Sequence, residues 1–520
     1  MSAFDVRDLL EAAGQPGALA GAVPQSVRDG LGTSAIPGAT FASEAPPPVP
    51  AGPLLSPVVL AGIVRIAEFA LIVGLGIACH QIELRGLVPL RLTYLGAILG
   101  IAGLALTLFQ AAGTYRIGAF RAFPKTAMKL IGAWTLAFLS VAAAMVLAKI
   151  SDHYSRLWLA TYYAAGLVML MSGRVVLALF IASRMRRGLF DRRTAIVGGG
   201  PAAEEMIRAL ETSGDGSIRI VGVFDDRNND RSSEVVAGYP KLGTVSDLVA
   251  YARRARLDLI VFTLPITAET RILQMLAKLW VLPIDIRLSA HATKLRLRPR
   301  AYSYLGTVPL LDVFDKPLAD WDVIAKTVFD RMVGLAMLFA LSPVMLAVAA
   351  TVKLSSPGPV LFRQKRYGFN NELIEVYKFR SMHVEQNDAG AARLVTKGDP
   401  RVTPVGRILR KTSLDELPQL FNVIRGNLSL VGPRPHALQA KAANALYDQV
   451  VDGYFARHKV KPGITGWAQI NGWRGETDTS EKLQRRVEHD LYYIENWSVA
   501  FDLRILLATP FALFNTKNAY

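Results

Sequence analysis

The sequence predicts an α/β membrane protein with four transmembrane helices, a Rossmann-like α/β domain, and a mixed, mainly helical domain behind a fifth apolar segment. Three observations predict it. Of the 520 residues, 51% are hydrophobic and the mean hydropathy is +0.28, which is high for a soluble protein. Four early apolar segments each reach about the 20 residues that span a bilayer as a helix. Strands and helices alternate between residues 193 and 295.

The N-terminal 53 residues are rich in Ala, Gly, Pro and Ser. This composition predicts a disordered tail over residues 1–53, with a short helix near residues 6–13. The tail lacks a basic start followed by an apolar core, so we expect no signal peptide. The single cysteine, Cys79, excludes an intramolecular disulfide.

A four-helix membrane domain is predicted over residues 54–183. Its apolar segments lie near residues 57–79, 92–112, 127–148 and 157–182. Arg65 and Glu68 stand one helical turn apart in the first segment and are expected to pair. Basic residues follow the second and fourth segments, namely Arg116, Arg121, Lys125, Arg184, Arg186, Arg187, Arg192 and Arg193. The positive-inside rule therefore places both stretches in the cytoplasm, and the chain after residue 183 is expected to start there.

A Rossmann-like α/β domain is predicted over residues 190–300. Helices are expected at 202–210 and 248–255, and strands at 193–197, 218–224 and 257–263. The turn Gly198–Gly199–Gly200–Pro201 could bring its backbone close to a pyrophosphate, with Asp225 and Asp226 ending the next strand. Pro201 removes one backbone donor, and a lone glycine-rich turn is a weak signal. Nucleotide binding and a purely structural, assembly or regulatory role both stay open.

The fifth apolar segment carries no charge from residue 332 to residue 352, a run long enough to cross a membrane. Ser342 and Pro343 interrupt it, and proline removes a helix hydrogen bond. Both flanks are basic, with Lys316, Lys326 and Arg331 before it and Lys353, Arg363, Lys365 and Arg366 after it. A kinked span and a re-entrant helix that returns to the same face are both compatible with this pattern.

Two adjacent carboxylates, Asp415 and Glu416, lie in a strongly basic stretch. Residues 353–435 contain 14 Lys or Arg and 7 Asp or Glu, and the whole chain has a formal charge of +17. Nearby cations keep a carboxylate ionised, and therefore nucleophilic or able to bind a metal. Phosphoryl chemistry uses Mg²⁺ with carboxylate ligands, and Arg or Lys to hold phosphate oxygens. By itself, an Asp-Glu pair can equally be a solvated acidic pair near a helix start.

The surrounding motifs resemble the bacterial sugar transferase family, the monotopic polyprenyl phosphate phosphoglycosyl transferases. They are residues 377–382 (YKFRSM), 410–420 (RKTSLDELPQL), 422–435 (NVIRGNLSLVGPRP) and 461–472 (KPGITGWAQING). The four spans and the α/β domain look like the large branch of that family, which includes undecaprenyl-phosphate glucose and galactose phosphotransferases. The resemblance implies a catalytic domain over residues 320–520, with a re-entrant helix at about 324–352 broken at Ser342 and Pro343.

What the resemblance implies for the site is specific. Asp415 is the expected nucleophile, Glu416 its partner, and both are expected to hold Mg²⁺. Lys378, Arg380, Arg410 and Arg434 are expected to bind the anionic substrate. The implied reaction moves hexose-1-phosphate from a UDP-sugar, UDP-glucose rather than UDP-galactose, to undecaprenyl phosphate. It releases UMP through a covalent aspartyl-phosphosugar and begins exopolysaccharide or capsule synthesis.

Partners and alternatives complete the expectations. A basic protein with membrane segments suits membrane lipid and phosphorylated substrates, and no nucleic-acid readout module is present, so no nucleic-acid partner is expected. The expected location is the bacterial inner membrane, with the catalytic domain on the cytoplasmic face. A homodimer is expected, because the spans and the α/β domain need some purpose beyond the chemistry. The alternatives are a catalytically inactive assembly scaffold for lipid-linked sugars and a transporter.

Overall fold

The computed structural model describes most of the chain in two compact units, which divide between residues 191 and 192. The described residues are 56–83, 91–115, 117–121, 123–186, 191–212, 218–227, 234–289, 303–305, 308–383, 399–436, 441–442, 445–447, 451, 453–474 and 479–514. The predicted tail, with its short helix near residues 6–13, lies outside them.

The first unit is a bundle of four long apolar helices. They are α3 (Pro57–Glu83), α4 (Leu92–Ala111), α6 (Phe123–Leu147) and α7 (Arg156–Arg186), with a short α5 (Ile117–Arg121) and a 3₁₀ turn η1 (Ser151–His153). Each long helix is apolar and long enough to cross a membrane. The helices occur where the apolar segments predict them, and their shared core is rich in aromatic side chains, including Trp134, Trp158 and Tyr162.

A buried charged group lies inside this bundle, and its pairing differs from the prediction. Glu68 contacts Arg174 of α7, with Oε1 2.8 Å from Nε, and accepts a 2.7 Å hydrogen bond from Tyr115 Oη. Arg65 instead lies over the Tyr115 ring, 4.8 Å from its centroid. The predicted Arg65–Glu68 pair is therefore replaced by a contact between helices, which also satisfies a polar group that would be costly inside a bilayer.

The second unit begins with an eight-stranded sheet in the order β3-β4-β2-β1-β5-β6-β8-β7. Its strands are β1 (Arg192–Val197), β2 (Ile218–Phe224), β3 (Val235–Val236), β4 (Tyr239–Gly243), β5 (Leu259–Phe262), β6 (Asp285–Ser289), β7 (Ser303–Leu305) and β8 (Val308–Phe314). Its helices are α8 (Pro201–Thr212), α9 (Val245–Arg254) and α10 (Glu269–Leu279), with a 3₁₀ turn η3 (Ile266–Ala268). Strands β4, β2, β1, β5 and β6 are parallel, as predicted.

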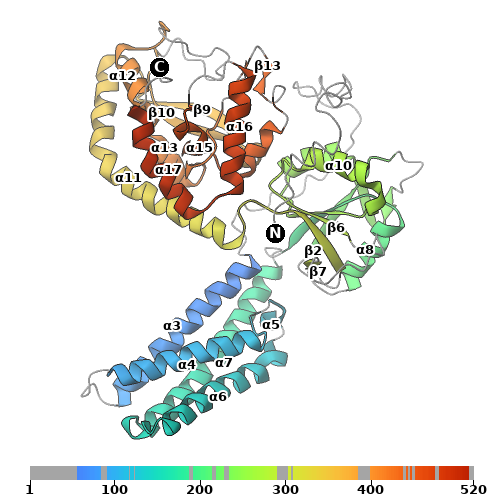
Figure 1. Cartoon of the computed structure of the whole chain (residues 1–520), viewed down its shortest axis with the longest axis vertical. Coiled ribbons are helices and arrows are strands. Elements are labelled where there is room, and N and C mark those ends of the chain that lie inside the picture. The colour runs from blue at the N-terminus through green and yellow to red at the C-terminus, as the bar shows by residue number, and fades with distance from the viewer. Residues whose placement is uncertain are drawn as a thin grey trace. The chain divides into compact units, whose positions relative to one another are not determined.

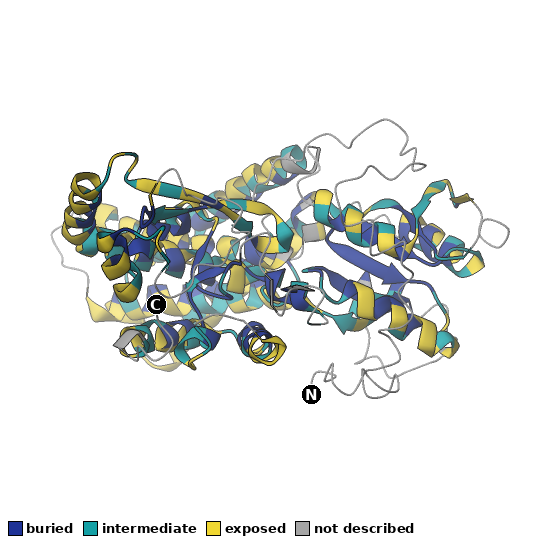
Figure 2. Ribbon diagram, turned by 90° about the horizontal axis from the view of Figure 1, so that it is seen from above, coloured by how far each residue is buried: buried dark blue, intermediate teal, exposed yellow. Residues whose placement is uncertain are grey.

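Helices cover both faces of this sheet. Ile196 of β1 packs with the buried face of α8, whereas its neighbours Ala195 and Val197 pack with α9 and α10 on the other face. The strands are therefore buried between helices whose outer faces are exposed (Figure 2). The antiparallel strands β8 and β7 extend the sheet past residue 300, where the predicted domain ends.

The remainder is a mixed, mainly helical domain built around α11 (Asp320–Ser355). Its other helices are α12 (Pro404–Thr412), α13 (Gln419–Arg425), α15 (Trp467–Ile470), α16 (Ser480–Glu495) and α17 (Val499–Phe514). Its strands are β9 (Leu361–Tyr367), β10 (Leu373–Phe379), β11 (Ser429–Val431), β12 (Lys441–Ala442), β13 (Ala445–Leu446) and β14 (Gly463–Thr465). The described 3₁₀ segments of this domain are η6 (Phe369–Asn371), η8 (Leu414–Glu416) and η9 (Tyr454–Lys459).

Helix α11 is the fifth apolar segment, and it is continuous through Ser342 and Pro343. The family resemblance implied a break at these residues; the helix does not end there, and it bends as it follows the domain (Figure 1). The Ser342 hydroxyl donates to the carbonyl of Phe339 at 2.8 Å. A proline is accommodated in a helix when neighbouring groups adjust in this way.

Candidate active site

The two carboxylates lie in η8, a single turn between α12 and α13. The sequence fixes both sides of this turn. Helix α12 begins with Thr403, whose Oγ1 accepts a 2.9 Å hydrogen bond from the Gly406 amide, followed by Pro404 in the first turn. It ends at Ser413, which has a left-handed φ of 59° and reverses the chain. The reversal turns Asp415 and Glu416 inward, towards the strand that carries Lys378.

Glu416 is held on both oxygens by cations. Its Oε1 accepts from Lys378 Nζ at 2.7 Å, and Arg434 donates to Oε1 at 2.7 Å and to Oε2 at 3.2 Å. Burial alone would raise the pKa of Glu416, but Arg434 and Lys378 outweigh it and hold the pKa well below its usual range. Glu416 is therefore a permanent anion that fixes the Lys378 and Arg434 side chains in one place.

Asp415 has the opposite environment. It is 8% exposed, and within the described part of the chain no group donates a hydrogen bond to its carboxylate. Burial raises the pKa of Asp415 to about 6, with Lys378 opposing the shift and Glu416 adding to it. Two neighbouring carboxylates with pKa values pushed apart are typical of a site where they have different roles.

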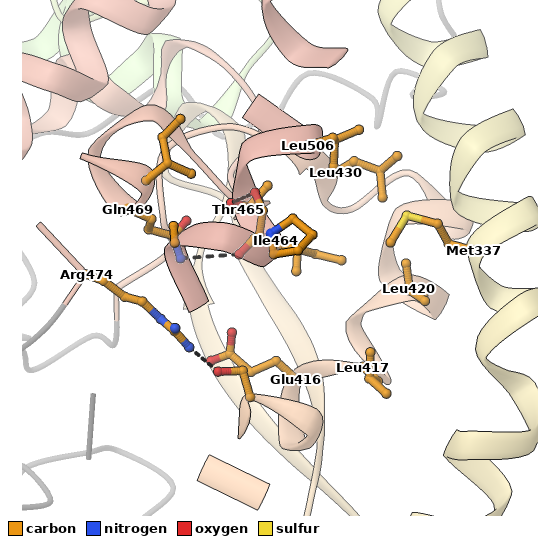
Figure 3. Close-up of a pocket in the computed structure, with 15 residues that line it drawn as sticks. Met337, Glu416, Leu417, Leu420, Leu430, Ile464, Thr465, Gln469, Arg474 and Leu506 are labelled. Atoms are coloured by element: carbon orange, nitrogen blue, oxygen red, sulfur yellow. Dashed lines mark hydrogen bonds between the residues drawn. The ribbon is translucent and has the colours of Figure 1, made fainter. Parts of the chain in front are cut away.

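A cavity of about 230 Å³ opens beside Glu416 (Figure 3). Glu416, Ser413 and Arg474 lie at one side of it, and Arg474 donates a short hydrogen bond to the Ser413 hydroxyl. Most of the other lining side chains are aliphatic and come from α11, α13, β14 and α17. The site therefore combines a free carboxylate, a fixed set of cations and an apolar cavity.

Comparisons with known proteins agree with this combination. A model of bacterial sugar transferases matches residues 321–516, and a model described as a CoA-binding domain matches residues 110–290. The UDP-glucose:undecaprenyl-phosphate glucose-1-phosphate transferase of Escherichia coli (strain K12) is 38% identical over 391 residues, 75% of this chain and 82% of that protein. The chain belongs to the bacterial sugar transferase family.

Further relatives extend the match. The enzyme of the same name from Xanthomonas campestris pv. campestris is 32% identical over 460 residues, which is 88% of this chain and 94% of that protein. A protein named exopolysaccharide production protein PSS from Rhizobium leguminosarum bv. phaseoli is 47% identical over 188 residues, 36% of this chain and 94% of that protein. With five helices among its described residues that are long and apolar enough to cross a membrane, this member of the family is a membrane-embedded protein.

The structure brings three of the four predicted cations to the carboxylates. Lys378 and Arg434 bind Glu416 directly. Arg410 donates from Nε to Ser381 Oγ at 2.9 Å, and it is close enough to Asp415 to lower the pKa of that carboxyl.

Arg380, the fourth predicted cation, binds backbone carbonyls near the end of α11. It is 3% exposed, and its guanidinium donates to the carbonyls of Val352, Ser356 and Pro357. These carbonyls lie at the end of α11 and just after it. Through these three backbone carbonyls, Arg380 anchors the end of α11 to β10, and we do not place it among the groups that bind the substrate.

Arg366 and Arg457 bind backbone carbonyls of the loop that carries Arg434. Neither residue was predicted from the sequence to belong to the site. Arg366 donates a short hydrogen bond to the carbonyl of Pro435. Arg457 is fully buried, donates to the carbonyl of Arg434 at 2.9 Å, and pairs with Asp490 at 2.5 Å. Arg366 stood in the basic flank after α11, but no pattern in the sequence links Arg457 to the loop, because 23 residues separate Arg457 from Arg434.

The metal-binding capacity of the site is limited. Among the described residues, no three His, Cys, Asp or Glu side chains cluster as metal ligands. Glu416 already accepts from two cations, whereas Asp415 is free. Mg²⁺ is commonly held by one or two carboxylates together with substrate phosphates, so the residues present fit an ion that binds with the substrate.

The glycine turn of the α/β domain is closed by its own side chains. The Gly199 amide donates to Asp225 Oδ2 at 2.8 Å, and Arg227 donates to the Gly199 carbonyl at 2.7 Å and to Asp225 Oδ2 at 2.7 Å. Burial would raise the pKa of Asp225, but Arg227 and the backbone amides lower it. The groups expected to hold a nucleotide are thus already hydrogen-bonded to each other, although nucleotide binding stays an untested prediction.

Proposed function

We propose that this protein transfers hexose-1-phosphate from UDP-glucose to undecaprenyl phosphate and releases UMP. The observation that carries the proposal is the free, buried carboxylate of Asp415 next to a Glu416 whose oxygens are occupied by Lys378 and Arg434. Relatives over most of the chain carry this activity in their names. A name that refers to exopolysaccharide supports exopolysaccharide or capsule synthesis as the pathway.

In the first half-reaction, an oxygen of the Asp415 carboxylate attacks the β-phosphorus of the UDP-sugar. A phosphorus–oxygen bond forms to Asp415, and the bond from the β-phosphorus to the oxygen that bridges to the α-phosphate breaks. UMP leaves with that oxygen and its electron pair. The product is an aspartyl-phosphosugar, and at pH 7 no proton has to be removed from Asp415, since its pKa is about 6.

In the second half-reaction, a phosphate oxygen of the lipid attacks the same phosphorus. The bond from phosphorus to Asp415 breaks, and the carboxylate recovers its electron pair. The product is a polyprenyl-diphosphate-sugar. Splitting the transfer in this way lets one site handle a soluble donor and a lipid acceptor in turn.

The cations around the pair have a role in both steps. Lys378 and Arg434, held rigidly by Glu416, are placed to hold phosphoryl oxygens without rearranging. Arg410 and Arg474 add positive charge near Asp415. When Mg²⁺ is bound with the diphosphate through Asp415 and Glu416, it supplies further neutralisation of the phosphate charge.

The surroundings of α11 support a catalytic domain at the cytoplasmic surface of the inner membrane, with α11 re-entrant. Gly334, in the first half of the helix, packs on Val423 of α13, and Val348 and Val352, near its end, pack with Phe379 and Leu409. A helix that contacts one domain at both ends does not place its ends on opposite sides of a bilayer. Its other face is apolar and exposed, with Phe339 84% and Leu346 71% exposed, which suits burial in one leaflet.

The test is UMP release by the purified full-length protein with UDP-glucose, undecaprenyl phosphate and Mg²⁺. Asp415→Asn is expected to lower turnover by a factor of about 10³ or more, because the nucleophile is lost. Asp315→Asn, which changes an exposed aspartate, serves as the matched control and is expected to retain full turnover. Full turnover by Asp415→Asn would refute the covalent mechanism, and no UMP release by the unaltered protein would favour the scaffold alternative.

The hexose is tested separately. UDP-glucose and UDP-galactose are offered in the same assay, and UDP-glucose is expected to give the higher kcat/KM. Mass spectrometry after reaction with donor alone should find a hexose phosphate on a peptide containing Asp415. A higher kcat/KM for UDP-galactose would reassign the sugar while leaving the mechanism intact.

A further inference from the structure

The cavity beside Glu416 is far more apolar than a site for a sugar nucleotide requires. Its wall is formed by Met337 of α11, Leu420 of α13, Leu430 of β11, Ile464 of β14 and Leu506 of α17 (Figure 3). Its volume is about 230 Å³. A cavity of about 150 Å³ lined by aliphatic side chains accepts benzene, so this one has room for about two branched five-carbon units.

The cavity lies between two charged side chains and two helices whose outer faces are apolar. One side carries Glu416 and Arg474, and the opposite walls belong to α11 and α17. Both helices turn apolar side chains outward: Leu335 and Phe339 of α11 are 57% and 84% exposed, and Leu507 and Phe511 of α17 are 64% and 77% exposed. Exposed apolar faces on this scale mark contact with a membrane or partner.

We propose that this cavity binds the isoprene units next to the phosphate of the polyprenyl acceptor. The inference rests on the proposed function, since it assigns the acceptor's chain to the site that Asp415 and Glu416 define. A prenyl chain entering between α11 and α17 carries its phosphate towards the cations at the inner end. The aliphatic lining stabilises the chain by removing it from water, by about 0.8 kcal/mol for each buried CH₂.

One group in the wall points to a rival occupant. The Gln469 side chain lines the cavity, and its Oε1 is buried with no hydrogen-bond partner in the described part of the chain. Such an acceptor could receive the imide hydrogen of a uracil base. The aliphatic lining favours the lipid, and the two occupants predict opposite effects on the two half-reactions.

The experiment compares two neighbouring residues of α17 in the full-length protein in lipid nanodiscs. Leu506→Trp fills the cavity, whereas Leu507→Trp changes a side chain on the exposed face of the same helix. We expect Leu506→Trp to raise the KM for undecaprenyl phosphate by about tenfold or more. It should leave the single-turnover burst of UMP from UDP-glucose alone unchanged, and Leu507→Trp should change neither quantity.

Two further measurements keep the proposal open to refutation if Leu506→Trp does not fold. The unaltered protein is expected to prefer undecaprenyl phosphate to a straight-chain alkyl phosphate, and Leu506→Ala should weaken that preference by enlarging the cavity. Gln469→Leu should lower the KM for undecaprenyl phosphate, because it removes an unpaired acceptor from the wall.

The outcomes distinguish failure of the cavity proposal from failure of the proposed covalent function. An unchanged acceptor KM in Leu506→Trp, or an unchanged lipid preference in Leu506→Ala, overturns the proposal. A raised KM for UDP-glucose in Gln469→Leu assigns the cavity to the base and overturns it too. If the unaltered protein shows no UMP burst with donor alone, the proposed covalent function fails instead, whatever the lipid preference.

Discussion

Two parts of this molecule place a carboxylate beside an arginine. They differ in whether a neighbouring carboxylate remains without a hydrogen-bond donor. At the glycine turn, Asp225, Arg227 and the Gly199 backbone satisfy one another. In η8, Glu416 is satisfied by Lys378 and Arg434, but the adjacent Asp415 is buried without a donor. A carboxylate that none of the described groups binds through a hydrogen bond is open to a substrate, whereas the carboxylate of the glycine turn is engaged by its neighbours.

The same contrast exists within the carboxylate pair. Glu416 stabilises the fold through two buried ion pairs, whereas Asp415 is ionised at neutral pH at a cost in stability. The two adjacent residues therefore affect stability with opposite signs. Four measurements test these differences.

The largest effect is expected for Glu416→Gln. The change leaves Lys378 and Arg434 without a counter-charge and should destabilise the protein by about 3–5 kcal/mol, measured as a lower midpoint of thermal unfolding. Glu204→Gln, which removes an exposed pair with Arg208, is the control and should cost about 0.5 kcal/mol or less. Equal losses in the two variants would show that the Glu416 pairs are no stronger than a surface pair.

The opposite sign is expected for Asp415→Asn. The pKa is about 6 in the folded protein against 3.8 for the ordinary carboxyl, so above pH 6 the ionised group destabilises the fold by an amount on the order of 2–3 kcal/mol. Asparagine carries no charge, so the variant should lose this destabilisation and show a higher midpoint of thermal unfolding at pH 7.5. As the pH falls from 6 towards 4, Asp415 takes up its proton in the folded protein before it does so in the unfolded chain. The stability that the variant gains therefore shrinks and disappears. A lower midpoint for the variant at pH 7.5 contradicts this sign.

The rate of the UMP burst should follow the protonation of Asp415. Below pH 6 the carboxylate is lost, and the rate should fall about tenfold for each pH unit. Glu416 does not titrate in this window, because its pKa lies well below its usual range. A burst rate that is flat between pH 7 and pH 4.5 would exclude Asp415 as the attacking group.

The smallest effect is expected at the glycine turn. Arg227→Met removes hydrogen bonds to Asp225 and to the Gly199 carbonyl, and should lower stability by about 1–2 kcal/mol. Sugar-phosphate transfer should stay within about twofold of the unaltered protein. Calorimetry with ADP as the probe is expected to find no binding in either protein, and tight binding by the unaltered protein would end the contrast between the two regions.

Sequence patterns predicted the long helices and three of the parallel strands, for a local reason. The long helices α3, α4, α6 and α7 follow from runs of apolar residues. The parallel strands follow from short buried runs between helices. The antiparallel addition of β7 and β8 was not predicted, because strand order depends on packing between distant segments.

The sequence was enough to predict Asp415, Glu416, Lys378, Arg410 and Arg434 as site residues, because they lie within motifs that resemble those of bacterial sugar transferases. Their partners became visible only in the fold. It committed Glu416 to Lys378 and Arg434, left Asp415 free, and turned Arg380 away to the end of α11. Hydrogen-bond partners and pKa shifts depend on which groups the fold brings together in space. The spacing of residues along the chain does not reveal these neighbours.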